Sequence, residues 1–547
     1  MKRAIWGTGL YASEFMYAMK KEKIDFFIDN DQRKSGQYYL GKKVLCPNEI
    51  KDWDDIFIYI PYNYYEEITK QLEKYGVNNE VQCQKYYEIN GMDVNDFRED
   101  YERALGELTQ QAEQMKGFCV FWGRCWAFAD KGYKEYIQEW RKRDKRLKLA
   151  LASEAVWYSK EETENIMGLP TIVTPGLFDD NVYLKGGALE EEQIEYLRSK
   201  QSAWHEVERL KIKFPDITEE SACYMIYYMY QYTIKLLDLI EPELIILYAK
   251  MMIQHKVVEE ICMEKGIPVI STHQGVLAGT YLFETYGEVG KSLSALYPQE
   301  FLQLPITGED LEHAKKVWKF LYNSKLNRKI QPQNNCVDYI LNKADKTKPI
   351  IFFAADDDVN ADLVPYTEEA GKYHSPVFET SIDAGIYIAK LCAQNGWNFI
   401  YKPHPMRARY EQKNRLPENT IYIEYGNIND IVDISDVVIT IVSQTNYVSL
   451  IRNKPVVMLG YNHIKGKGCT YEAFEKGNIG EAIKEALERG VTKEQKEAFL
   501  IHIAQLIKYY LYDDLQEREI RYGRGVPNNI DDFYQLHDLL RKDKPRW

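Results

Sequence analysis

Residues 397–405 read Trp-Asn-Phe-Ile-Tyr-Lys-Pro-His-Pro, and this stretch decides the fold. It begins with a short apolar strand, 398–401, and stops at Lys402 and a proline–histidine–proline sequence. Two prolines around one histidine continue neither a helix nor a central strand, so His404 is held on a stiff loop at the carboxyl end of a strand. Ligands bind at that end of the strands in an open α/β sheet. The loop, which ends at Pro405, is therefore a predicted ligand site.

The next predicted strand follows the same plan. Residues 436–442 are almost all apolar, as expected of a strand that is covered on both faces, and another strand follows at 454–459. Between them, 443–445 are hydrogen-bonding residues that suit a helix N-terminus, which offers free N–H groups and a positive dipole end to an anion. An imidazole, a lysine and a polar helix start at neighbouring strand ends predict a phosphate-binding site. Its predicted residues are Lys402, His404, Pro405, Ser443, Gln444 and Thr445.

A chain of 547 residues is too long for a single hydrophobic core, and three or more domains are expected. Alternating strand and helix patterns predict an α/β fold with doubly wound sheets. The predicted segments are a Rossmann-like domain over 1–90, a linker helix over 91–115, α/β domains over 116–345 and 346–490, and C-terminal helices over 491–547.

The first ninety residues contain a dinucleotide-type turn. The strand 3–6 runs into 7–12, which matches Gly-x-Gly-x-x-Gly/Ala through Gly7 and Gly9. Asp29 ends the next strand about twenty residues later, where a ribose contact is expected. These three residues are candidate ligand contacts. The same glycines also suit a tight strand-to-helix turn in an accessory module, and we favour a binding or docking role over dinucleotide catalysis.

A second informative stretch lies in the middle of the chain. Strands at 244–248 and 268–271 flank a helix over 254–265, and this unit exits into a loop that begins at 272. His273 in that loop is a candidate general base for an acceptor hydroxyl, because the unperturbed pKa of histidine lies near neutral pH. Hydrogen bonding to the loop backbone is the alternative role for this histidine.

Composition and charge exclude several classes of protein. The net charge is −13, which argues against bulk attraction to nucleic acid or to an anionic membrane. The nine cysteines are scattered without a Cys-x-x-Cys pair, which favours reduced thiols over disulfides or a zinc site. The start lacks the apolar core of a signal peptide, and charged residues and a proline interrupt the longest apolar region, 224–253. These features predict a cytoplasmic protein.

Three motifs together resemble the capsule polysaccharide biosynthesis family. They are the Lys-Pro-His-Pro loop at 402–405, the Val-Ser-Gln-Thr sequence at 442–445, and the strand and glycine–lysine run at 454–470. Members of this family resemble GT-B glycosyltransferases, and the best-known ones transfer Kdo from CMP-Kdo. The resemblance covers about 117–475, while 27–44 resembles the Rossmann-like N-terminal domains that many surface-sugar enzymes carry.

The resemblance implies a GT-B pair of Rossmann-type domains. The acceptor side is expected over 116–345, the nucleotide-sugar side over 346–490, and the C-terminal helices are expected to pack back across the first half. The implied activity is transfer of a sugar, with a CMP-sugar as the favoured donor, to a glycan or glycolipid acceptor of the capsule. GT-B enzymes hold phosphate with protein groups, so neither a metal nor another cofactor is expected, although the carboxylates of 356–358 would also suit magnesium. Peripheral association with membrane polysaccharide machinery is expected, without a transmembrane segment.

Two positions depart from the family. Gln274, next to Gly275, stands where the Kdo-transferring branch has the acidic residue that is its expected nucleophile, and an amide cannot take that role. Val448 replaces a glutamate that would hold the nucleotide ribose. These departures argue against a Kdo donor and a double-displacement mechanism. The predicted substrate-loop residues are Gln274, Gly275, Asp358 and Asn360.

Three other functions stay open. A CDP-glycerol-type glycerophosphotransferase resembles this architecture and also uses a His-Pro loop. A non-catalytic scaffold of polysaccharide assembly would account for the two altered positions. A dehydrogenase or epimerase built on Gly7 and Gly9 would need a Tyr-x-x-x-Lys pair in the same domain, and no convincing pair is present.

Overall fold

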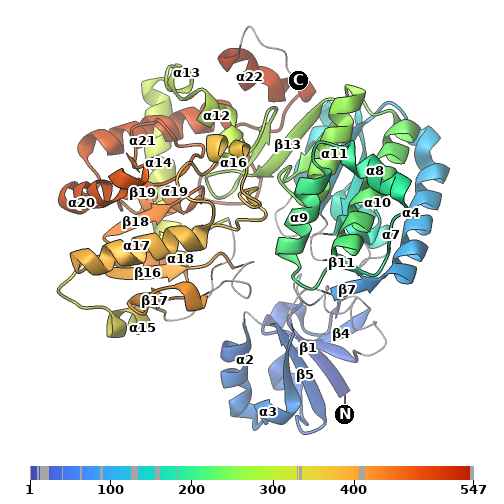
Figure 1. The fold of residues 1–547 in the computed structure, drawn as a ribbon, viewed down its shortest axis with the longest axis horizontal. Coiled ribbons are helices and arrows are strands. Elements are labelled where there is room, and N and C mark those ends of the chain that lie inside the picture. The colour runs from blue at the N-terminus through green and yellow to red at the C-terminus, as the bar shows by residue number, and fades with distance from the viewer. Residues whose placement is uncertain are drawn as a thin grey trace. The chain divides into compact units, whose positions relative to one another are not determined.

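In the computed structural model the chain forms two compact units, which are described separately. Figure 1 labels their helices and strands. The first unit comprises 1–116, 122–131 and 149–241, and the second comprises 117–121, 132–148 and 242–547. The structure describes residues 2–8, 12, 24–39, 41–61, 64–86, 90–124, 133–153, 160–179, 182–328, 331, 336–405, 413–424 and 426–541. Gly9 and most of the helix expected after it lie outside these residues.

A six-stranded sheet forms the N-terminal part of the first unit. Its strands are β1 (Lys2–Trp6), β2 (Phe26–Ile28), β3 (Tyr38–Tyr39), β4 (Lys42–Leu45), β5 (Ile56–Pro61) and β6 (Cys83–Tyr86), with helices α2 (Tyr65–Leu72) and α3 (Asn79–Gln82). The order is β3-β4-β2-β1-β5-β6, and all neighbours are parallel except β3 and β4. Trp6, Ile28 and Ile58 lie in its buried core. The parallel order confirms the predicted α/β class for this segment.

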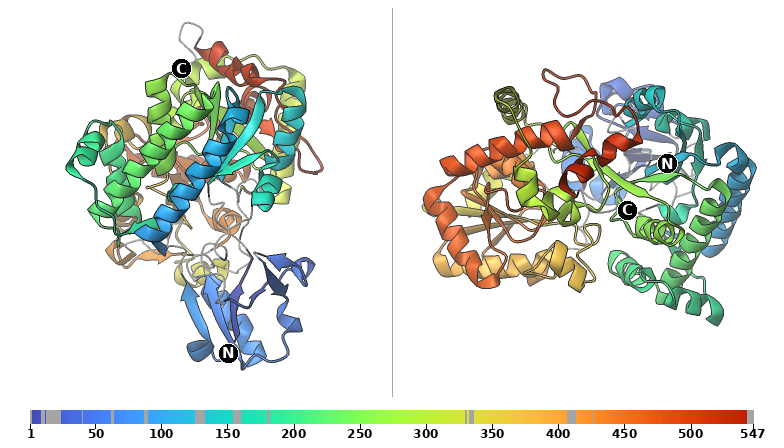
Figure 2. Two further views of the ribbon diagram at one scale, coloured as in Figure 1. Left: turned by 90° about the vertical axis from the view of Figure 1, so that its right-hand side faces the viewer. Right: turned by 90° about the horizontal axis from the view of Figure 1, so that it is seen from above.

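Helices dominate the rest of the first unit. They are α4 (Val94–Met115), α7 (Lys160–Met167), α8 (Glu191–Arg198), α9 (Ala203–Lys213) and α10 (Glu219–Ile240). The helices α4 and α10 run side by side (Figure 2), where Phe97 and Tyr101 pack edge-on against Tyr228. The short strands β7 (Asn90–Asp93) and β11 (Val182–Lys185) pair in parallel, and so do β9 (Leu147–Ser153) and β10 (Thr171–Val173). Strand β8 (Cys119–Arg124) and strand β9 are each divided between the two units.

The second unit contains the predicted strand–helix–strand motif, formed by β12 (Leu244–Tyr248), α11 (Ile253–Lys265) and β13 (Val269–Gln274). The same part of the unit also contains α6 (Tyr133–Arg143), β14 (Thr280–Glu284) and, from the distant C-terminal region, β21 (Tyr512–Asp513). Strand β12 is parallel to β13, whereas β14 is antiparallel to both β13 and β21. We call these four strands the first sheet of the second unit.

The prediction of an exit loop starting at 272 is wrong. His273 and Gln274 form the end of β13 and pair with β14 across a hairpin. The reason is that 280–284 is a run of β-forming residues that supplies a partner strand, and the N–H of Gly275 donates to the carbonyl oxygen of Thr280 at 2.7 Å to close the hairpin. A Cβ at Gly275 would lie 2.0 Å from Thr280 Oγ1, so this close approach requires glycine.

A six-stranded, fully parallel sheet follows, which we call the second sheet of the second unit. Its strands are β15 (Ile350–Ala354), β16 (Asn398–Lys402), β17 (Thr420–Tyr422), β18 (Val437–Thr440), β19 (Val456–Met458) and β20 (Tyr471–Glu472). The order is β17-β16-β15-β18-β19-β20. The surrounding helices are α16 (Glu368–Tyr373), α17 (Ser381–Asn395), α18 (Ile428–Ile434), α19 (Thr445–Ile451) and α20 (Ile479–Arg489). The predicted buried parallel strands are therefore confirmed.

Helices connect and follow the two sheets of the second unit. Those between the sheets are α12 (Leu293–Leu296), α13 (Pro298–Leu302), α14 (Gly308–Ser324) and α15 (Cys336–Lys343). After the second sheet come α21 (Lys493–Gln505), a π-helix (Leu506–Tyr510) and α22 (Gln535–Leu540). In the part of the chain that the structure describes, no helix combines the length and the apolar character that crossing a membrane would require.

Candidate active site

The carboxyl ends of three neighbouring strands meet at one edge of the second sheet. Ala354 at the end of β15 is in register with Lys402 of β16 and with Thr440 of β18, and all three strands are parallel. The loops that leave these strands, 356–360, 403–405 and 443–445, therefore begin at the same edge. The structure thus brings the predicted phosphate-binding residues together.

His404 lies beside Asp357, a contact that the sequence did not predict. Its Nδ1 is 3.8 Å from Oδ2 of Asp357, and about a quarter of the His404 side chain is exposed. Asp357 Oδ2 also accepts a hydrogen bond from Asn360 Nδ2 at 2.8 Å. A carboxylate at this distance stabilises a positive charge on the imidazole, and such a charge would interact favourably with a bound phosphate.

The other two carboxylates of the acidic loop bond within the protein. Asp356 Oδ2 accepts from the N–H of Val442 at 3.1 Å, and burial raises the pKa of Asp356 to about 8. Asp358 accepts from the N–H and the hydroxyl of Ser381, at 2.8 and 2.5 Å, at the start of α17. These contacts give Asp358 and Asn360 a role in shaping the loop, and their predicted contact with substrate stays a prediction.

The polar helix start predicted after β18 is present. Helix α19 has seven residues and Gln444 is its N-cap. The hydroxyls of Ser443 and Thr445 lie 3.1 Å apart. The Lys402 side chain is almost fully buried at the end of β16, whereas Pro405 is exposed.

Arg328 connects the two sheets of the second unit at this place. It lies on the chain between α14 and α15, where its Nη1 donates to Gln444 Oε1 and its Nη2 contacts His273 Nδ1. The ring of His273 stacks on Tyr248 with 5.3 Å between centroids. Sequence reasoning missed Arg328, because a lone arginine in a connection between helices belongs to no motif and no periodic pattern.

The candidate residues of the N-terminal sheet form a separate group in the first unit. Asp29 accepts hydrogen bonds from Thr8 Oγ1 at 2.5 Å, Lys34 Nζ at 3.0 Å and the N–H of Asp31 at 2.9 Å. Gly7 has φ +97°, a conformation that favours glycine. The contacts of Asp29 hold the strand ends of this sheet together, and a ribose contact there stays a prediction.

Two glutamates, one at the end of the hairpin strand β14 and one shortly after it, are buried carboxyl groups. Glu284 on β14 accepts from the N–H of Leu293 at 3.2 Å and from the hydroxyl of Tyr510, and burial raises its pKa to about 8. Glu288 accepts from the N–H of Lys250 at 2.8 Å, and burial raises its pKa to about 7. Both groups therefore hold a proton far more tightly than an exposed glutamate does.

The raised pKa of Glu284 predicts how stability depends on pH. An unfolded chain releases this proton near pH 4.5 whereas the folded protein keeps it until about pH 8, so the free energy of unfolding falls as pH rises between these values. The side chain of Glu284→Gln cannot ionise. We therefore expect the melting temperature of this variant to fall less than that of the wild type between pH 5 and about 8.5. Thermal unfolding across this pH range checks the expectation, with the exposed Glu300→Gln as the control. Parallel curves for Glu284→Gln and wild type would contradict it.

Comparison with known proteins agrees with the resemblance seen in the sequence. A family model described as capsule polysaccharide biosynthesis protein matches residues 386–507, which include Lys402, His404 and 443–445 but neither His273 nor Arg328. A model described as C2185-like, N-terminal, matches residues 1–81. The predicted resemblance to the capsule family, with an added N-terminal domain, is confirmed. No curated protein sequence matches the chain.

Three solved structures illustrate the structural similarity. The KpsC β-Kdo 2,4-transferase of Thermosulfurimonas dismutans is 15% identical over 50% of this chain and 82% of its own, with a TM-score of 0.35. The β-Kdo 2,7-transferase of the same organism is 15% identical over 55% and 87%, with a TM-score of 0.33. A UDP-GlcNAc 2-epimerase of Methanocaldococcus jannaschii is 10% identical over 71% and 99%, with a TM-score of 0.31. Similarity of this degree assigns no reaction.

Proposed function

We propose that this protein is a glycosyltransferase of capsule polysaccharide synthesis, which transfers a sugar from a nucleotide-activated donor to a glycan or glycolipid acceptor. One observation carries the proposal: the register of β15, β16 and β18 gathers His404 with Asp357, Lys402 and 443–445 at one sheet edge. The capsule family model matches the segment that holds His404 and 443–445. The proposed reaction takes place in the cytoplasm, has a CMP-sugar as its favoured donor, and needs neither a metal nor another cofactor.

The proposed chemistry is a single displacement at the anomeric carbon of the donor sugar. The bond from this carbon to the donor phosphate breaks, the acceptor oxygen forms the new bond, and the acceptor proton leaves to solvent or a base. The nucleotide departs with an extra negative charge, which His404 and Lys402 stabilise electrostatically. Gln274 supports direct displacement, because an amide forms no covalent intermediate with the sugar.

A thermal-shift screen tests the nucleotide site. A ligand that binds only the folded protein raises its melting temperature. At a ligand concentration of 100 times the dissociation constant, the free energy of unfolding rises by about 2.7 kcal/mol. We expect one nucleotide among CMP, CDP, UDP and GDP, or a sugar conjugate of it, to give a clear shift. A shift that persists in His404→Ala would indicate that the nucleotide binds at another site, such as the Gly7 turn. No shift with any ligand would argue for the scaffold alternative.

A product assay then tests the reaction. Incubation with the nucleotide-sugar that gives the shift and a capsule fragment should release the nucleotide and lengthen the glycan by one sugar, as measured by mass spectrometry. Release of CMP from CDP-glycerol, with a glycerol phosphate on the acceptor, would instead identify the glycerophosphotransferase alternative.

A further inference from the structure

The contacts of Arg328 determine which atoms donate and which accept. Its Nη1 bonds Gln444 Oε1 and its Nη2 bonds His273 Nδ1. A guanidinium carries donors only, and burial lowers the pKa of Arg328 only to about 10, so the group stays charged at neutral pH. Both partner atoms must therefore be acceptors.

This contact decides where a neutral His273 carries its proton. Nδ1 also lies 3.2 Å from the carbonyl oxygen of Gln274, a contact that would need a proton on Nδ1. The two contacts exclude each other, because a proton on Nδ1 would face an N–H of Arg328. The guanidinium keeps its proton, and the carbonyl contact lies at the long end of the hydrogen-bond range. Nδ1 is therefore the acceptor, and the proton lies on Nε2.

Aromatic side chains fix the plane of the His273 ring. Tyr248 stacks on it with 17° between the ring planes. Tyr133 packs edge-on against Tyr248 at 5.8 Å and stacks on Tyr281 at 3.9 Å between centroids. Aromatic rings thus fix the orientation of the imidazole, and Arg328 determines its tautomer.

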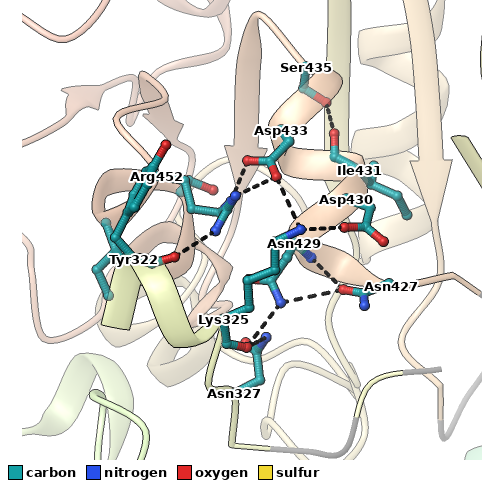
Figure 3. Close-up of polar contacts among 12 residues, drawn as sticks. Tyr322, Lys325, Asn327, Asn427, Asn429, Asp430, Ile431, Asp433, Ser435 and Arg452 are labelled. Carbon is teal, nitrogen blue, oxygen red and sulfur yellow. Dashed lines mark hydrogen bonds and ion pairs between the residues drawn. The ribbon is translucent and has the colours of Figure 1, made fainter. Parts of the chain in front are cut away.

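The chain that carries Arg328 is anchored three residues earlier (Figure 3). Lys325 ends α14 with φ +52°, and its Nζ lies 2.9 Å from Asp430 Oδ1 on α18. Its carbonyl oxygen accepts from Asn429 Nδ2 at 3.2 Å. Backbone and side chain of Lys325 are therefore both fixed on α18, which limits the positions that Arg328 can take.

The residues at the two ends of α19 contact helix α14 and Arg328. Arg452, directly after the helix, bonds both carboxylate oxygens of Asp433 and donates to the carbonyl oxygen of Tyr322 at 3.4 Å (Figure 3). Gln444, at the start of the same helix, accepts from Arg328. Because α19 is only seven residues long, these contacts hold Tyr322 of α14 and Arg328 near the two ends of one short helix.

We infer that Arg328 is a positioning residue that keeps His273 neutral with its proton on Nε2, so that any hydrogen bond between His273 and a substrate oxygen is donated from Nε2. The inference rests on the proposed function for the identity of that substrate. It replaces the general-base role expected for His273 from the sequence, since a base needs a nitrogen lone pair and Arg328 occupies the one on Nδ1. A neutral imidazole that donates from Nε2 can stabilise charge that develops on an oxygen.

The tautomer is measurable without any substrate. In full-length protein with ¹⁵N-labelled histidine rings, the signals of His273 are identified by their loss in His273→Gln. We expect the shifts of a protonated Nε2 and an unprotonated Nδ1 at pH 7, and we expect Arg328→Met to move the proton toward Nδ1 and the carbonyl of Gln274. Arg489→Met, which removes a half-exposed arginine of the same unit, should leave these shifts unchanged. A protonated Nδ1 in the wild type would overturn the inference.

Kinetics separate positioning from binding once the donor is known. Arg328→Met should lower kcat by about 10- to 100-fold with a smaller change in the donor KM, as expected for a misoriented group. Arg328→Lys should recover part of this loss, because an ammonium also donates to Nδ1. The nucleotide-induced thermal shift should persist in Arg328→Met. An unchanged kcat would overturn the positioning role, whereas a wild type that binds no nucleotide would refute the proposed function and leave the tautomer result standing.

Discussion

Replacing His404 with alanine is expected to slow sugar transfer by about 10²- to 10³-fold, the loss typical of removing one preorganised group that stabilises developing charge. The imidazole lies beside Asp357 at a strand end, where it can carry a positive charge toward the departing phosphate. The side chain is partly exposed on a loop, so its removal leaves no cavity in the core. The melting temperature without ligand should therefore stay close to that of the wild type.

Two companion variants sharpen this expectation. Asp357→Asn keeps the shape of the neighbouring group but removes its charge, and it should give a smaller loss of rate than His404→Ala. His313→Ala removes a histidine from α14, outside the site, and should transfer sugar at the wild-type rate. Initial rates at saturating donor distinguish the three. A wild-type rate of sugar transfer by His404→Ala would show that His404 has no role in the reaction.

Gly290→Ala is expected to destabilise the second unit by about 3 kcal/mol or more, at the upper end of overpacking effects. A Cβ at this position would lie 1.6 Å from the carbonyl oxygen of Tyr373 and 3.0 Å from that of Tyr461. Both are backbone atoms, so no side-chain rotation relieves the clash. The Tyr461 N–H also donates to the carbonyl oxygen of His374 at 2.7 Å, which ties the two loops together. The segment after β14 can therefore pack there only with glycine.

Thermal unfolding measures this effect, with a drop of about 4 °C expected for 3 kcal/mol in a unit of roughly 330 residues. Gly308→Ala is the matched control, because Gly308 begins α14 and a Cβ there meets nothing within 4 Å. We expect that control to match or exceed the wild-type melting temperature, since alanine favours helix. Equal melting temperatures for Gly290→Ala and Gly308→Ala would show that the loops move apart at little energetic cost.

Continuous apolar runs and local helix-end signals in the sequence made most of the fold predictable. The apolar runs that form β16, β18 and β19 were visible because strands buried on both faces show no alternation. Helix α17 begins and ends at signals that can be read locally, because Thr380 accepts from the N–H of Asp383 and Gly396 ends the helix with φ +70°. The end of β13 was misjudged, because Gln274 followed by glycine looks like a strand exit, and only pairing with 280–284 makes it a hairpin.

The candidate site was predictable only as far as its motifs reach. His404 stands between two prolines, a local pattern that can be read from neighbouring residues. Asp357 and Arg328 become relevant through strand register and a long connection, and both depend on contacts far apart in the sequence. The inference about His273 depends on a contact of the same kind, since its tautomer is set by a side chain 55 positions away.

The pairing of β21 with β14 has a consequence for how the protein is made. Tyr512 and Asp513 complete the first sheet of the second unit, beside strands that the ribosome produces long before them. Until those residues emerge, β14 presents an open edge, and open edges invite association with other chains. Folding of the first sheet on the ribosome therefore waits until Tyr512 and Asp513 have been made, and a fragment cut before Tyr512 should aggregate instead of yielding a smaller folded protein.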